Sequence, residues 1–255
     1  MSDAAPREMP ARADDHAIRV AVVIPAYQAA ATLGAVVSGL RAALPQASVV
    51  AVDDGSSDDT VAVASAACDE VVRFERNRGK GAALRAGIAL SLSGGADAVL
   101  TIDADGQHDP AAAPSLVAAL GDADIAIGER ARRGSEMPFA RRATNALSAC
   151  AMSAFAGQRI GDPQSGYRAL RRGVLESVAA YGDRYEYEAD LLLRAARAGY
   201  RIASVPVTTR YGAPSHFRLV RDGLLVVRSI WRHRDGAFDD KATPARAVGL
   251  HPLVR

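Results

Sequence analysis

Residues 18–60 read IRVAVVIPAYQAAATLGAVVSGLRAALPQASVVAVDDGSSDDT. This stretch holds an apolar run at 18–25, an alanine-rich run at 31–44, and a second apolar run at 48–54 that ends in two aspartates. The two β-branched runs have the composition of buried strands, and the segment between them has the length of a helix. A helix is the usual connection between parallel strands. The stretch therefore predicts a β-α-β unit and an α/β fold.

The alternation of strands and helices continues along the chain. The further expected elements are helices at 58–67 and 81–92 and strands at 70–75, 97–105 and 122–129. Short apolar strands separated by helices predict a mostly parallel central sheet with helices on both faces, a Rossmann-like three-layer sandwich. We expect one domain at 18–234, a disordered tail at 1–17 and a flexible tail at 235–255, because both ends lack hydrophobic periodicity.

The composition limits the classes of function. The chain has 255 residues, 49% of them hydrophobic, and a formal net charge of +2. These values favour a globular protein with a sizeable core and no nucleic-acid partner. Residues 1–17 lack the apolar core of a signal peptide, and no run approaches the roughly 18 apolar residues of a membrane-spanning helix. We therefore expect a cytoplasmic protein.

A basic segment at 215–234 reads SHFRLVRDGLLVVRSIWRHR. Its apolar residues recur at steps of three and four, as on one face of a helix, and arginines flank them. Such a basic amphipathic helix is suited to peripheral contact with an anionic membrane, here the cytoplasmic face. An ordinary helix packed on the sheet has the same pattern, so both interpretations stay open.

The strongest local signal is LTIDADGQHDP at 100–110, where an apolar strand ends in two carboxylates. Residues two apart on an extended chain point to the same side, so Asp103 and Asp105 are expected to face one crevice. Carboxylates arranged in this way suit Mn²⁺ or Mg²⁺ bridged to a diphosphate. A turn that simply ends the strand is the alternative. The neighbouring Gln107 and His108 do not indicate zinc, because no second His or Cys is close in the sequence.

Two further segments place polar residues at the expected ligand-binding edge. Asp53 and Asp54 end a strand and are suited to hydrogen-bonding a ribose or a base, although acids there also build caps and turns. In RNRGKGAALRAG at 76–87, glycines lead into a helix whose N-terminus favours anions, and Lys80 lies at that point. The spacing is not that of a P-loop. A solvated surface lysine is the alternative for Lys80.

Seven sequence blocks occur in order along the chain. They are IPAYQAA (24–30), VDDGSSDDT (52–60), NRGKGAALRAG (77–87), DADGQHDP (103–110), IGER (127–130), DPQSGYRALRR (162–172) and YEYEADLLLRAARAGYRIASVPV (185–207). Together they resemble the family-2 nucleotide-sugar glycosyltransferases of GT-A fold, in particular the dolichyl-phosphate mannose synthase-like branch. The resemblance covers nearly all of residues 18–234 and favours the metal-binding interpretation of the two aspartates.

The resemblance implies a nucleotide-sugar site at the carboxyl ends of the strands. The implied nucleotide-sugar-binding residues are Pro25, Ala26, Tyr27, Asp53, Asp54, Lys80, Asp103 and Ala104. Asp103, Asp105 and Gln107 would hold Mn²⁺ or Mg²⁺. Where the family pattern reads PxYNE, this chain has Gln28 and Ala29, so the identity of the donor stays open.

The resemblance also implies residues for catalysis and for the acceptor. Arg130 would lie beside the leaving diphosphate, and Glu188, with Glu186 in reserve, would be the general base that a hydroxyl acceptor needs. A lipid phosphate is already anionic and needs no base, so Glu188 would then position or bind. Further implied contacts to phosphate or acceptor are Arg141, Arg142, Ser165, Arg168 and Arg210.

The expected function is that of an inverting, metal-dependent glycosyltransferase. It would move one sugar from a GDP- or UDP-linked donor to a polyprenyl phosphate or another lipophilic acceptor. One alternative is transfer to a hydroxyl of a soluble or carrier-bound acceptor in cell-envelope glycan or secondary-metabolite biosynthesis. Another is a catalytically degenerate, nucleotide-binding interaction module.

Overall fold

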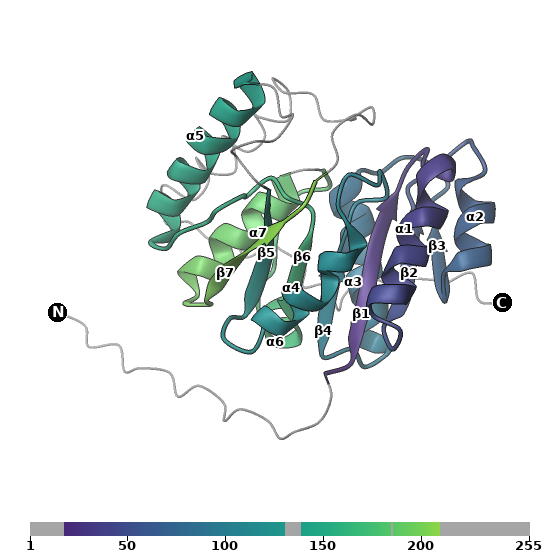
Figure 1. Cartoon of the computed structure of the whole chain (residues 1–255), viewed down its shortest axis with the longest axis horizontal. Helices are drawn as coiled ribbons and strands as arrows, with labels where there is room; N and C mark the ends of the chain where they lie inside the picture. Colours follow the sequence, from purple (N-terminus) through teal and green to yellow (C-terminus); the bar gives the residue numbers. More distant parts are fainter. Residues whose placement is uncertain (1–17, 131–138, 185, 210–255) are drawn as a thin grey trace.

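The computed structural model describes residues 18–130, 139–184 and 186–209. These residues contain a seven-stranded sheet with the strand order β3-β2-β1-β4-β6-β5-β7 (Figure 1). The strands are β1 (Val20–Ala26), β2 (Ser48–Asp53), β3 (Glu70–Arg73), β4 (Ala98–Thr101), β5 (Ile125–Arg130), β6 (Arg168–Arg171) and β7 (Ile202–Val207). The helices are α1 (Ala30–Ala43), α2 (Thr60–Ala67), α3 (Lys80–Ser93), η1 (Pro110–Ala112, a 3₁₀ turn), α4 (Ala113–Ala119), α5 (Phe139–Ala156), α6 (Arg172–Ser177) and α7 (Glu186–Arg197).

The expected mostly parallel sheet is confirmed. Strand β1 pairs in parallel with β2 and β4, β2 with β3, and β5 with β7. Strands β6 and β7 were not expected, and β6 runs antiparallel between β4 and β5. Its sequence, RALR, has no apolar run, so only its two neighbours make it a strand. Strand β7 contains Pro206 and lies at the end of the strand order, where a missing N–H costs no ladder bond.

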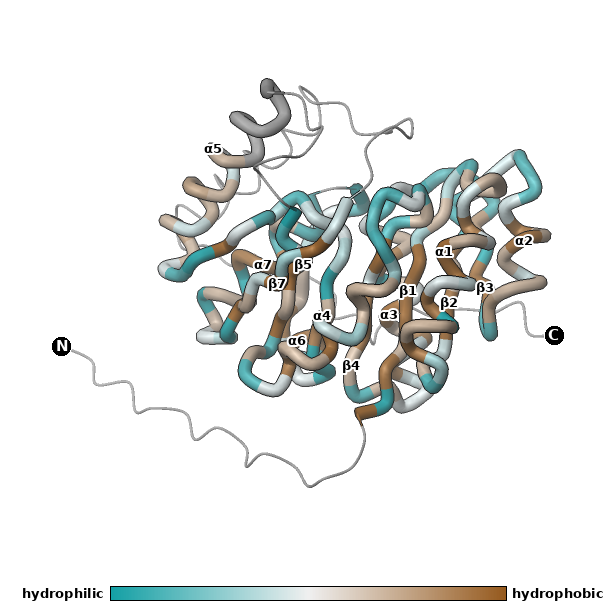
Figure 2. Tube along the Cα trace, in the orientation of Figure 1, coloured by the Kyte–Doolittle hydropathy of each residue, from teal (hydrophilic) through white to brown (hydrophobic). Residues whose placement is uncertain are grey.

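Helices cover the sheet on both faces, as the three-layer expectation requires. Helices α1, α2 and α4 share one apolar cluster with the sheet, and α3 and α7 share the other. Successive residues of β1 enter opposite clusters, with Val22 and Ile24 on one side and Val23 on the other. Because the central strands are buried on both faces, hydrophobic residues run continuously along them (Figure 2).

The strand expected at 97–105 is shorter than predicted. β4 ends at Thr101, so Asp103 and Asp105 lie in the turn beyond it and not on extended chain. The carboxylate of Asp105 accepts a hydrogen bond from the backbone N–H of Gln107 at 3.0 Å, which builds the turn. The turn interpretation is therefore correct for the backbone, and it leaves the aspartates at the carboxyl edge of the sheet.

Several expectations lie outside the described residues. They are the tails at 1–17 and 235–255, the amphipathic segment at 215–234 and the side chain of Arg210. Across the part of the chain that the structure describes, no helix combines the length and the apolar character needed to cross a membrane.

Candidate active site

Three charged side chains converge at the carboxyl edge of the sheet. The Lys80 Nζ atom lies 2.7 Å from Asp103 Oδ1 and 3.0 Å from Glu188 Oε2. Lys80 is the first residue of α3, Asp103 follows β4, and Glu188 is in the first turn of α7. The side chains of Lys80 and Glu188 are 15% and 9% exposed, so water screens this ion pair weakly. We call Lys80, Asp103 and Glu188 the Lys80 cluster.

Two features of the backbone position Lys80. The carboxylate of Asp54 accepts hydrogen bonds from the N–H groups of Arg78 and Gly79 at 2.6 and 2.9 Å, and so fixes the loop that enters α3. Gly79 has a φ of 102°, a conformation that favours glycine. At the other side of the cluster, a Cβ on Gly166 would lie 2.5 Å from Asp103 Oδ2 and 2.7 Å from Lys80 Nζ. The ion pair therefore needs a glycine at position 166.

The buried side chain of Arg168 holds Glu188 and the segment 163–165 in place. This side chain is 2% exposed, and its guanidinium donates to the carbonyl groups of Ser165, Pro163 and Glu188 at 2.7, 2.7 and 2.8 Å. Its Nη2 atom lies 4.0 Å from Glu188 Oε1, which is buried and has no hydrogen-bond partner. The sequence suggested a phosphate or acceptor contact for Arg168, whereas the structure directs its donors to backbone carbonyls.

Arg130 forms a second ion pair at the same edge. Its Nε and Nη2 atoms lie 2.6 and 2.9 Å from the two carboxylate oxygens of Asp162, a bidentate geometry. Asp162 is 1% exposed. Sequence reasoning missed Asp162, although its block, DPQSGYRALRR, carried part of the resemblance. A buried acid at a fixed distance from Arg130 orients that arginine at the end of β5.

The two aspartates of the D-x-D segment have opposite pKa shifts. Burial alone would raise the pKa of Asp103, but the charge of Lys80, followed by His108, lowers it below its usual value. Burial raises the pKa of Asp105, and the neighbouring charge of Asp103 raises it further. For Lys80, burial would lower the pKa, and the carboxylates of Asp103 and Glu188 raise it above its usual range. Of these two aspartates, Asp105 therefore takes up a proton first when the pH falls.

The donor atoms of this segment fit a magnesium or manganese ion that is shared with a substrate phosphate. Asp103, Asp105 and Gln107 supply oxygen atoms, which these cations prefer. In the ranges 18–130, 139–184 and 186–209, no group of three or more His, Cys, Asp or Glu side chains is placed to hold a metal. Mg²⁺ is commonly held by one or two carboxylates plus substrate phosphates, so the residues present match that type of site.

His108 is buried beside the D-x-D segment. Burial lowers its pKa to about 4. The imidazole is therefore neutral near pH 7, and its ring centroid lies 5.3 Å from that of Tyr167. Its Nδ1 atom is buried without a hydrogen-bond partner. His108 contributes packing and a polar atom to the wall of the site.

The predicted nucleotide contacts lie at the carboxyl ends of neighbouring strands and in the loops that follow them. Tyr27 is 39% exposed at the end of β1, and Pro25 and Ala26 precede it in the strand. Asp53 is fully buried, and both of its carboxylate oxygens lie 3.2 Å from the backbone N–H of Ser56. The carbonyl of Ala104 accepts from the Thr32 hydroxyl at 2.6 Å. The structure thus places Tyr27 toward solvent and uses Asp53 to hold a turn.

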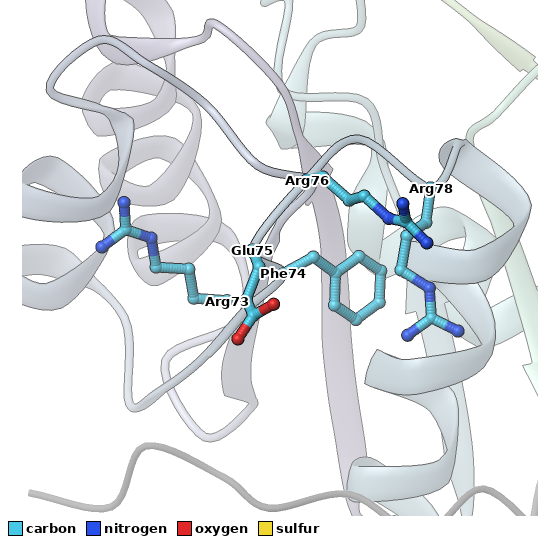
Figure 3. A pocket seen from close by; sticks show the side chains of 5 residues that line it. All are labelled: Arg73, Phe74, Glu75, Arg76 and Arg78. Atoms are coloured by element: carbon cyan, nitrogen blue, oxygen red, sulfur yellow. The ribbon is translucent and has the colours of Figure 1, made fainter.

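A basic pocket that the sequence did not predict opens beside Asp53. It is lined by Arg73, the last residue of β3, and by Phe74, Glu75, Arg76 and Arg78 of the loop that leads to α3 (Figure 3). The Arg78 guanidinium lies 4.6 Å from the centre of the Phe74 ring, and Arg73 Nε lies 3.9 Å from Asp53 Oδ2. An anionic or carbonyl-rich group is the type of ligand that such a pocket suits.

The remaining predicted residues divide into three groups. Ser165 is buried, and its hydroxyl accepts from the Tyr167 N–H at 3.3 Å. Glu186 begins α7, and its Oε2 atom is buried without a hydrogen-bond partner. Arg141 and Arg142 lie on α5, but their side chains are outside the described residues, as is Arg210.

Comparison with known proteins supports a common family. The model of the family described as "Glycosyl transferase family 2" matches residues 21–179. An undecaprenyl-phosphate mannosyltransferase of Micrococcus luteus is 33% identical over 202 residues, which are 75% of this chain and 83% of the relative. A polyprenol monophosphomannose synthase of Mycolicibacterium smegmatis is 35% identical over 208 residues, 74% of this chain and 77% of the relative.

A solved structure supports the fold. Glucosyl-3-phosphoglycerate synthase of Mycobacterium tuberculosis, crystallised with Mn²⁺, UDP and glucosyl-3-phosphoglycerate, superimposes with a TM-score of 0.68. The sequence identity is 24%, and the match covers 84% of this chain and 79% of that one. The same fold and family are indicated by the strand order, by the acidic residues at the carboxyl edge of the sheet and by the match to the family model. The chain therefore belongs to glycosyl transferase family 2 and is a glycosyltransferase of GT-A fold.

Proposed function

We propose that this enzyme transfers a single sugar from a GDP- or UDP-linked donor to a polyprenyl phosphate, with inversion and with a divalent cation. Two relatives that the chain covers over most of their length have names that specify polyprenyl-phosphate mannose transfer. The alternative acceptor is a hydroxyl group. The two acceptors make different chemical demands on Glu188, and those demands distinguish them.

The observation that carries the proposal is the ion pair between Lys80 Nζ and Glu188 Oε2, at 3.0 Å. A hydroxyl acceptor must lose its proton to a base within hydrogen-bond reach. Glu188 has one oxygen on Lys80 and the other buried against Arg168, so neither oxygen is presented as a free base. A phosphate monoester has a second pKa of about 6 and attacks as an anion. The site therefore favours a phosphate acceptor, with Glu188 in a positioning role.

The reaction then proceeds by direct displacement. An oxygen of the lipid phosphate forms a bond to the anomeric carbon, and the bond from that carbon to the nucleoside diphosphate breaks on the opposite face. A divalent cation held by Asp103, Asp105 and Gln107 would stabilise negative charge on the leaving diphosphate. Arg130, oriented by Asp162, supplies a second positive charge to the same leaving group.

Contact with a membrane surface follows from the proposed acceptor. The hydrophobic tail of a polyprenyl phosphate resides in the bilayer, and its phosphate lies at the interface. The enzyme must then bring the carboxyl edge of its sheet to that surface. The basic segment at 215–234 is the candidate for peripheral contact, because arginines near an anionic surface contribute about 1 kcal/mol each.

The donor is tested by thermal shift with a panel of UDP-, GDP- and other nucleotide sugars, each with and without Mn²⁺. Saturable binding should raise the unfolding midpoint for one donor and more so with Mn²⁺. The mechanism is tested with Glu188→Gln at saturating Mn²⁺. We expect kcat with polyprenyl phosphate to fall less than about tenfold, whereas loss of a general base costs roughly a hundredfold or more. A loss of that larger size would refute the positioning role and favour a hydroxyl acceptor.

A further inference from the structure

The ammonium group of Lys80 contacts a carboxylate that is proposed to bind the divalent cation. The Nζ atom is 2.7 Å from the Oδ1 atom of Asp103, one of the oxygens proposed to bind the divalent cation. The absence of a Cβ at Gly166 makes room for this ammonium, because a Cβ there would lie 2.7 Å from Nζ. The same Cβ would lie 2.5 Å from Oδ2, the other carboxylate oxygen of Asp103. The protein thus supplies its own positive charge to Asp103.

The charges around this position are nearly balanced. The described residues at this edge include the carboxylates of Asp103, Asp105, Asp162 and Glu188 and the cations Lys80, Arg130 and Arg168. Together they carry one net negative charge. A divalent cation alone would leave the site with one excess positive charge in a partly buried environment, where charges interact strongly. The diphosphate of a nucleotide sugar that arrives with the cation adds two negative charges and restores the original balance, and free GDP or UDP adds at least that many.

We propose, on the basis of the proposed function, that Lys80 acts as the internal counter-cation of Asp103 and makes divalent-cation binding depend on the diphosphate of the donor. Without the diphosphate, the ammonium repels the incoming cation and competes for Asp103. With it, Glu188 retains Lys80 through the 3.0 Å contact, and Asp103 is free to turn to the cation. Lys80 is in this sense a positioning residue, because its charge acts on the reaction through Asp103.

The test is a titration with Mn²⁺ alone, followed by electron paramagnetic resonance, and its repetition with saturating GDP or UDP. The wild type should bind Mn²⁺ weakly alone and at least tenfold more tightly with the nucleotide that the thermal-shift panel selects. In Lys80→Met the Kd for Mn²⁺ alone should fall about tenfold. Because Asp103 has already turned to the cation when nucleotide is bound, the Kd with nucleotide should change little, so the enhancement by nucleotide should shrink by about the same factor. Damage to the site cannot produce this result, because damage weakens metal binding.

Two further variants sharpen the test. Glu188→Gln removes a negative charge from the same cluster and should weaken the binding of Mn²⁺ alone, the opposite sign to Lys80→Met. Arg41→Met is the matched control, because Arg41 is paired with Asp69 at 2.8 Å in the last turn of α1, at the opposite edge of the sheet from the site, and loses the same charge there. It should behave as the wild type.

The inference is overturned if Lys80→Met binds Mn²⁺ no more tightly than the wild type, or if its nucleotide enhancement is unchanged. It is also overturned if Glu188→Gln and Lys80→Met shift the Kd for Mn²⁺ alone in the same direction. The titration needs neither sugar nor acceptor. If the wild type transfers sugar but Lys80→Met leaves the nucleotide enhancement of Mn²⁺ binding unchanged, only the role of Lys80 is contradicted. If the enhancement changes as expected but the wild type transfers no sugar, only the proposed function is contradicted.

Discussion

Arg130 and Asp162 form a bidentate ion pair, with N–O distances of 2.6 and 2.9 Å, that joins the end of β5 to the loop before β6. Both side chains are nearly buried, with 12% and 1% exposed. Charge-assisted, bidentate pairs of this kind fix the plane of the guanidinium. The pair therefore determines the direction in which Arg130 presents its positive charge at the carboxyl edge.

Replacing Asp162 with Asn should lower kcat by roughly 10- to 100-fold, because Arg130 loses its orientation and its contribution to leaving-group stabilisation falls. The KM for the donor should change much less. Steady-state kinetics with saturating acceptor separate the two parameters. Asp69→Asn, which breaks the exposed pair with Arg41, is the control and should leave kcat unchanged. A large rise in KM with an intact kcat would show that the pair serves donor binding.

Asp105→Ala should abolish transfer and leave the fold intact. Burial and the charge of Asp103 raise the pKa of Asp105, so this carboxylate does not stabilise the folded protein on its own account. The substitution removes a ligand of the proposed cation site and leaves the apolar core unchanged. Circular dichroism and the thermal midpoint should match the wild type, while activity at any Mn²⁺ or Mg²⁺ concentration is lost. An active Asp105→Ala variant would contradict the mechanism.

Cation binding should weaken on acidification at a higher pH than an ordinary aspartate would cause. The raised pKa of Asp105 means that it gains a proton while most carboxylates are still charged. A protonated Asp105 is a poor ligand, so the affinity for Mn²⁺ in the presence of nucleotide should fall as the pH drops through that pKa. The effect on stability has the opposite sign, because protonation relieves the buried charge. A Mn²⁺ affinity that is constant down to the usual aspartate range would contradict this prediction.

Gly166→Ala should disrupt the Lys80 cluster. The new Cβ would lie 2.5 Å from Asp103 Oδ2 and 2.7 Å from Lys80 Nζ, so both groups must shift. We expect a destabilisation of about 1–3 kcal/mol, typical of overpacking, together with loss of transfer activity. Gly173→Ala on α6 is the matched control, because nothing lies within 4 Å of its Cβ position. Urea denaturation and transfer assays should leave Gly173→Ala at or above wild-type stability and at wild-type activity.

The sequence predicts the buried parallel strands well because burial on both faces requires continuous apolar runs, as in VAVVIPA of β1. It does not predict β6, because the four residues RALR become a strand only between β4 and β5. Because β6 is not predicted, the sequence also does not predict that Gly166 lies close to Asp103. Two residues beyond the paired Thr101 and Arg168 the two segments are still close, since a Cβ on Gly166 would lie 2.5 Å from Asp103 Oδ2.

The candidate site was predicted as separate residues and not as contacts. Lys80, Asp103 and Glu188 were each singled out, but their blocks are far apart in the sequence, and only the fold pairs them. Asp54 and Arg168 were expected to face ligands, and the structure directs both to backbone groups that position the cluster. Residue type alone cannot distinguish a ligand contact from such a bracing role, because both use the same hydrogen-bonding groups.

The central claim is that the acceptor is a lipid phosphate, and it is tested most directly by comparing two matched acceptors. The purified enzyme, with the nucleotide sugar that the thermal-shift panel selects and Mn²⁺, is given either polyprenyl phosphate or the polyprenol of the same chain length. Radiolabelled sugar extracted into organic solvent measures the product. We predict transfer to polyprenyl phosphate and none to polyprenol. Transfer to polyprenol at a comparable rate, or no transfer to polyprenyl phosphate with any bound donor, would contradict the account.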